Sequence, residues 1–161
     1  MNKRPLAITL YAAVSLIAGA SALVGMLINY RAYRAVSLLC GTAICILLIL
    51  GSYYLFKESS LGWHITIFLQ FVVISKSYAA ILYLFINISK VTFTTENVNE
   101  YILKYGFQAL LGMGILYYFL TLTTTQYFGV IQKHKLKFIR LVVPIACIVA
   151  LLQFATHSII M

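Results

Sequence analysis

Acidic residues are nearly absent from this sequence, which contains no aspartate and only three glutamates, Glu58, Glu96 and Glu100. This scarcity leaves little room for acid–base catalysis by paired carboxylates or for a carboxylate cage around Ca²⁺ or Mg²⁺. Charged residues of both signs make up 9% of the chain, against about 25% in a soluble domain. The composition therefore excludes a soluble globular enzyme, a disordered chain and a coiled coil.

Several motifs of metal and nucleophile chemistry are also missing. The three histidines are scattered, without the HExxH spacing of a zinc enzyme. Cys40, Cys45 and Cys147 form no CxxC pair and fit the pattern of small apolar packing residues. The sequence has neither a GxSxG motif nor a Gly-rich phosphate loop. We therefore expect no catalytic residue, no metal site and no cofactor.

Apolar residues dominate instead, at 63% of the chain with a mean hydropathy of +0.98. A bilayer core about 30 Å thick is crossed by about 20 apolar residues of helix. The apolar runs are continuous rather than alternating, which favours helices over strands. We predict an all-α integral membrane bundle, a single membrane domain with five transmembrane helices: Leu6–Ile28, Ala35–Phe56, Trp63–Ile88, Gly106–Phe128 and Phe138–Ile160.

The basic residues between these runs predict the orientation. With the N-terminus inside, seven Lys and Arg fall on the cytoplasmic side and four outside, which agrees with the positive-inside rule. The net charge of +9 is thus spread among short connections, and we expect no nucleic-acid binding. The predicted location is the cell (inner) membrane, with the C-terminus outside. The largest contribution comes from a cytoplasmic basic loop: Lys133, Lys135, Lys137 and Arg140.

The first run has some features of a signal peptide. Lys3 and Arg4 precede an apolar stretch, and Ala20-Ser21-Ala22 matches a small-x-small cleavage site. The apolar stretch continues to Ile28, however, which is longer than a signal sequence requires. We expect this run to remain in the membrane as a helix.

Lys76 is the one basic residue that topology does not explain, because it lies in the middle of the third run. A lysine at mid-membrane costs about 2.5–3.5 kcal/mol on insertion scales. A helical projection places it in one polar arc, which predicts either a site for an anion, a proton or a partner's carboxylate, or a lysine satisfied by neighbouring polar groups. The arc comprises Thr66, Gln70, Lys76, Ser77, Tyr83 and Asn87.

A second polar stripe follows one face of the fourth run, through Gly114, Tyr118, Thr121 and Thr125. It fits either hydrogen bonding between helices or the lining of a polar cavity shared with Lys76. The candidate intramembrane polar site is therefore Lys76, Gln70, Ser77, Tyr83, Tyr118 and Thr121.

The first 70 or so residues also carry a pattern of basic, apolar and aromatic residues that is seen in other membrane proteins. Lys3-Arg4-Pro5-Leu6 precedes an apolar helix, and Tyr54-Leu55-Phe56-Lys57 is followed by Gly62-Trp63. The pattern combines a short basic turn with an interfacial tryptophan. It resembles many small prokaryotic multi-pass membrane proteins, which are mostly uncharacterised, so the resemblance implies a membrane protein and no activity.

These observations lead to two functional hypotheses. The first is a non-enzymatic accessory, assembly or immunity-type protein that acts through helix contacts with another membrane protein or a second copy. The alternative is a small oligomeric transporter or channel in which Lys76 faces an anionic solute. In both cases the lipid bilayer surrounds the protein and is itself a partner.

Overall fold

The computed structural model describes residues 5–29, 35–87 and 95–158, and these residues form helices joined by turns, with no strand among them. The helices are α1 (Leu6–Ile28), α2 (Ala35–Phe56), α3 (Ser60–Asn87), α4 (Thr95–Leu120), α5 (Leu122–Tyr127) and α6 (Gln132–Ser158). The protein is therefore all-α, as the apolar runs predict.

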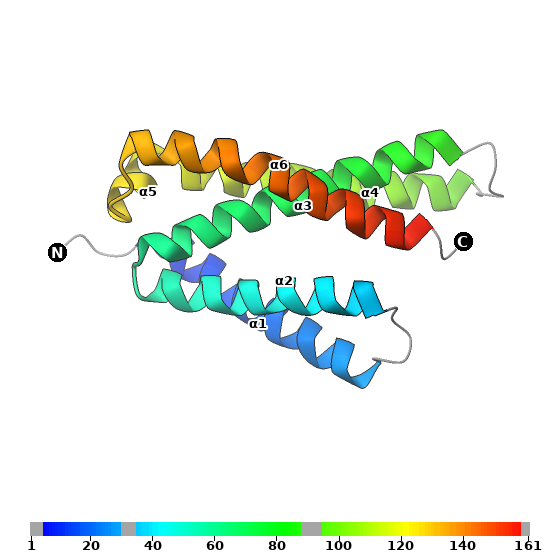
Figure 1. Ribbon diagram of the computed structural model, residues 1–161, viewed down its shortest axis with the longest axis horizontal. Helices are drawn as coiled ribbons and strands as arrows, with labels where there is room; N and C mark the ends of the chain where they lie inside the picture. The colour runs from blue at the N-terminus through cyan, green and yellow to red at the C-terminus, as the bar shows by residue number, and fades with distance from the viewer. Residues whose placement is uncertain (1–4, 30–34, 88–94, 159–161) are drawn as a thin grey trace.

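The long helices lie in two layers (Figure 1). The hairpin of α1 and α2 forms one layer, and α3, α4 and α6 form the other. Helix α3 lies at the centre, because it packs against α2, α4 and α6. The start of α1, the α2–α3 turn and the short α5 lie at one end of the bundle, and the last turn of α6 lies at the opposite end. The chain thus runs along the bundle through α1, α2, α3, α4 and α6 in turn.

The main buried cluster lies at the end of the bundle where α1 begins. Trp63 is at its centre and is fully buried. The cluster draws on both layers, so it is the place where the α1–α2 hairpin is fixed to the other helices. Its members are Ile8, Ala12, Leu55, Trp63, Ile67, Phe119 and Phe128.

The α2–α3 turn is unusually tight. Glu58 has a φ of 56°, and it donates its backbone N–H to Leu55 O while Ser59 N–H bonds Tyr54 O. This pair of bonds is the Schellman arrangement that ends many helices, with glutamate in the position where glycine is usual. Just beyond the turn, Gly62 sits so close to α2 that an added Cβ would lie 2.5 Å from Leu55 N. The absence of a side chain at Gly62 therefore allows α3 to lie directly against the end of α2.

Within the described residues, three helices are long and apolar enough to cross a membrane: Leu6–Ile28, Leu38–Phe56 and Ser60–Ile86. Helix α4 differs from its predicted run, because it begins at Thr95 and ends at Leu120, whereas the apolar run Gly106–Phe128 continues further. Helix α4 therefore includes the polar residues before Gly106 in its first turns. The apolar residues after Leu120 belong to α5 and the turn that follows it.

Replacing Gly62 by alanine should destabilise the bundle by about 1–3 kcal/mol, because the added methyl overlaps backbone atoms of α2 and forces the helices apart. Unfolding in mixed detergent and SDS measures this change. Gly106→Ala is the matched control, since its Cβ meets nothing within 4 Å. That variant should be neutral or more stable by up to about 1 kcal/mol. Equal stability of the two variants would contradict the tight contact.

Candidate functional site

The fourth apolar run is interrupted at Thr121. Its φ of −61° and ψ of 152° are those of extended backbone, so α4 ends there and α5 begins with the next residue. The Thr121 hydroxyl donates to Tyr118 O at 2.8 Å, and Thr121 O accepts bonds from the amide and the hydroxyl of Thr125 at 3.0 Å each. The threonine side chains thus replace helical hydrogen bonds around the break.

The break deprives the last carbonyls of α4 of their usual partners four residues later. Phe119 O instead accepts a buried hydrogen bond from the indole Nε1 of Trp63 on α3, at 2.7 Å. Leu120 O accepts one from the Lys135 ammonium on α6. A buried carbonyl without a partner costs about 1–3 kcal/mol. Helices α3 and α6 therefore stabilise the end of α4 through one side chain each.

The far end of α5 is closed by a glycine turn. Gly129 has a φ of 64° and donates to Gln126 O, while Val130 N–H bonds Thr125 O at 2.9 Å. These two bonds are again the Schellman arrangement, here with glycine in the left-handed position. The segment 121–130 is therefore a defined turn that leads the chain from α4 back into α6.

This turn encloses a cavity of about 600 Å³, which we call the threonine cavity. Pro5, just before α1, forms part of one wall, and the other walls come from the end of α4 and from α5. Hydroxyl and amide groups are prominent in the lining, which comprises Pro5, Tyr118, Thr121, Thr123, Thr124, Gln126 and Tyr127.

A second hollow of about 350 Å³ lies between α1 and α4, and we call it the α1–α4 groove. Apart from two tyrosines its lining is apolar. Tyr118 contributes to the lining of both hollows, which are otherwise lined by different residues. The lining of the groove comprises Ala7, Tyr11, Leu110, Leu111, Gly114, Ile115, Tyr118 and Phe119.

Part of the polar arc predicted on the third run faces the interior. Thr66, Gln70 and Ser77 are buried, and Gln70 Nε2 donates to the Tyr11 hydroxyl on α1 at 2.8 Å. Ser77 Oγ is buried with no hydrogen-bond partner among the described residues. Gln70 thus connects the two layers of the bundle. The side chain of Asn87 lies outside the described part of the chain.

Lys76 differs from that arc, because its side chain is exposed. Successive residues are turned by about 100° around a helix, which takes Lys76 out of the buried face that holds Ser77. It lines neither the threonine cavity nor the α1–α4 groove. The charged group that acts on it is Lys104 of α4, a second cation. Tyr118 and Thr121 therefore share a cavity with each other but not with Lys76.

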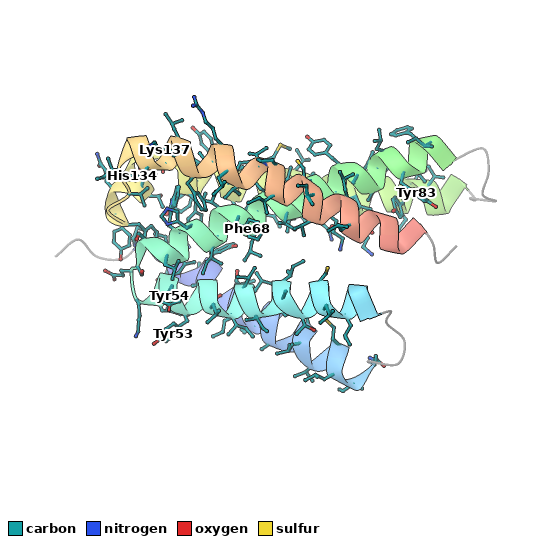
Figure 2. The ribbon with its side chains drawn as sticks, in the orientation of Figure 1. Tyr53, Tyr54, Phe68, Tyr83, His134 and Lys137 are labelled. Atoms are coloured by element: carbon teal, nitrogen blue, oxygen red, sulfur yellow. The ribbon has the colours of Figure 1, made fainter. Side chains whose placement is uncertain are left out.

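Tyr83 is half-buried on α3, toward the end of the bundle opposite Tyr53 and Tyr54 (Figure 2). It lies on the same side of α3 as Lys76, since seven residues make almost two full turns. Near this end, the rings of Tyr101 and Tyr105 on α4 lie 4.5 Å apart, and the Lys104 ammonium is 5.8 Å from the Tyr105 ring centroid.

The predicted basic loop proves to be the first turns of α6. His134 and Lys137 are exposed there, at the end of the bundle that holds α5 (Figure 2). Arg140 is exposed one turn further on. Lys135 is half-buried and donates a hydrogen bond to Leu120 O. The side chain of Lys133 lies outside the described part.

Lys57 adds positive charge in the α2–α3 turn. A hydrogen bond from its ammonium to the Tyr53 hydroxyl raises the pKa of this exposed lysine. Its ammonium also lies 4.6 Å from the Tyr53 ring centroid, a cation–π geometry.

Two features of this region are not predicted from the sequence: the burial of Trp63 and the residues of the threonine cavity. Trp63 fits the pattern of an interfacial tryptophan, and the structure adds that it is completely buried within the protein with a buried partner for its indole. Its depth in the membrane stays a prediction. A tryptophan at the end of an apolar run has the same signature in both environments. The cavity residues Thr123, Thr124 and Gln126 were also missed. The signal was the run Thr-Leu-Thr-Thr-Thr ahead of Gly129, which interrupts an otherwise apolar segment.

In comparisons with protein-family models, curated proteins and solved structures, none matches this chain. The resemblance of the first 70 residues to small multi-pass proteins therefore stays a prediction. In the part of the chain that the structure describes, no three His, Cys, Asp or Glu residues gather closely enough to hold a metal ion.

Lys135→Met should destabilise the protein by about 1–3 kcal/mol, because it leaves Leu120 O without its charged donor. The change is measured as a shift of the unfolding midpoint in SDS. Lys137→Met removes the same charge from an exposed position two residues later and should stay within about 0.5 kcal/mol of the parent. If both variants shift the midpoint equally, loss of positive charge rather than loss of the cap is responsible.

Proposed function

We propose that this chain is a multi-pass protein of the cell membrane, with five transmembrane helices and a cytoplasmic N-terminus, that acts through lateral helix contacts with a partner membrane protein. In this role it is an accessory, assembly or immunity-type protein without catalysis of its own. The observation that carries the proposal is Lys76, an exposed cation in the middle of an apolar helix.

The five-helix topology is supported by the arrangement of the bundle. Helices α1, α2 and α3 include spans apolar enough for the membrane, and α4 and α6 lie alongside α3. Helices α4 and α6 have 26 and 27 residues, which at about 1.5 Å per residue exceeds the hydrocarbon thickness of about 30 Å. The start of α1 and the end of α6 at opposite ends agree with an odd number of crossings.

The surroundings of Lys76 favour an acidic partner. Val73, one turn earlier on α3, is exposed beside it, so the lysine lies on an apolar surface that would face lipid in an isolated bundle. The sequence places no carboxylate in α3, and the charge that acts on Lys76 among the described residues is the like charge of Lys104. An ionisable residue at membrane depth is stabilised by a paired charge. A carboxylate on a neighbouring protein's helix supplies that pair.

The transporter alternative receives less support from the geometry. It requires Lys76 to face a solute path through the bundle, whereas neither described cavity is lined by Lys76. The Lys76 side chain is instead exposed on the surface of α3, where a second helix can pack against it. Contact with a partner is therefore the function that this placement favours.

A photo-crosslinking amino acid at Val73 tests the proposal in native membranes. We expect one main adduct, whose crosslinked peptide belongs to a transmembrane helix containing Asp or Glu. Lys76→Met should reduce the adduct at least tenfold, since it removes the charge pair, and Lys76→Arg should restore most of it. Mass spectrometry of the adduct identifies the partner, and a second copy of this chain is distinguished by its own peptides.

The same crosslinker at Ile17, which is exposed on α1, is the matched control. Its adducts should not respond to Lys76→Met. An adduct at Val73 that is equally strong with Lys76→Met, or one formed only with lipid, would contradict the proposed partner contact.

A further inference from the structure

The threonine cavity and the α1–α4 groove lie on two sides of Tyr118 and differ in the polar groups that line them. On one side of Tyr118 the walls carry threonine hydroxyls and the Gln126 amide, and on the other they are mainly aliphatic. Two neighbouring hollows, one with hydrogen-bonding groups in its wall and one almost wholly apolar, are complementary to an amphiphile. Neither part belongs to the Lys76 surface.

The polar part offers hydrogen-bond donors to an anion. Thr123 and Gln126 are exposed side chains in its wall, and the described residues that line it include no carboxylate. Lys135 places its ammonium on Leu120 O, directly beside the cavity residue Thr121. His134 and Lys137 are exposed at the same end of the bundle. This end therefore combines neutral donors with nearby positive charge, which favours an acceptor such as a phosphate group.

The α1–α4 groove runs along the helices, as an acyl chain does in a bilayer. Leu110 lies about 15 Å along α4 from Leu120, so the groove extends from the end of the bundle toward its middle. The groove is open at Gly114, because an added Cβ at this position would meet nothing within 4 Å. The polar cavity lies at the end of the helices, where headgroups meet a membrane protein. Both volumes also fall in the range of about 300–1,000 Å³ that is typical of ligand pockets.

We propose that the threonine cavity and the α1–α4 groove together form a binding site for one anionic phospholipid. The phosphate accepts hydrogen bonds from Thr123 and Gln126 at the mouth of the cavity, and one acyl chain lies between α1 and α4. Pro5 has no backbone N–H, so the α1 side of the cavity adds shape rather than a donor at this residue. The site is independent of the partner contact at Lys76.

Native mass spectrometry of the full chain in detergent tests the site, with phosphatidylglycerol and phosphatidylcholine of the same acyl chains as the two probes. We expect one phosphatidylglycerol to bind at least tenfold more tightly than phosphatidylcholine. Gly114→Leu should weaken phosphatidylglycerol binding at least tenfold, because the new side chain fills the groove. Gly106→Leu is the matched control, a glycine of the same helix with an equally open Cβ that lines neither hollow.

A second variant examines the polar end separately. Thr123→Val combined with Gln126→Leu should reduce the preference for phosphatidylglycerol to about that for phosphatidylcholine, while leaving the helices in place. Glycerol phosphate without acyl chains should not displace the bound lipid. Equal binding of the two lipids by the parent chain, or equal effects of Gly114→Leu and Gly106→Leu, would overturn the proposal.

Discussion

The hydrogen bond from the Trp63 indole to Phe119 O is the interaction on which the arrangement of the helices depends. Backbone polar groups that lie away from water need partners inside the protein. The break at Thr121 leaves the last carbonyls of α4 without helical partners, and side chains of α3 and α6 bond two of them. The same two contacts tie three helices together at one end of the bundle. A local interruption of one helix is thus converted into a fixed tertiary junction.

Several features of the molecule follow from this junction. Gly62 lets α3 approach α2 closely enough to bury Trp63. The turn after Thr121 returns the chain to α6, which then packs along α3. The threonine cavity exists because α5 leaves the axis of α4 instead of extending it. The break therefore connects the packing of the fold to the candidate lipid site, while Lys76 belongs to a separate surface on α3.

Much of this fold can be predicted from the sequence, because continuous apolar runs determine where helices form. The bounds of α1 and α2 agree with the predicted runs. The break at Thr121 could not be placed in the same way, since threonine is tolerated within membrane helices and the apolar residues continue to Phe128. The buried position of Trp63 and the exposed position of Lys76 depend on which neighbours cover each face of α3. The periodicity of one helix shows which residues share a face. It does not show which other helix covers that face, so it could not predict either position.

The most direct test of this account uses the fact that Trp63 is the single tryptophan of the chain. Its indole N–H gives one resonance in the NMR spectrum of the ¹⁵N-labelled protein in detergent, and exchange of that proton with deuterated water can be followed over time. A buried bond to Phe119 O predicts that this proton exchanges far more slowly than that of an indole at the membrane surface. It also predicts low accessibility of the tryptophan fluorescence to a water-soluble quencher. Exchange as fast as that of a surface indole, together with ready quenching, would contradict the central role of this contact.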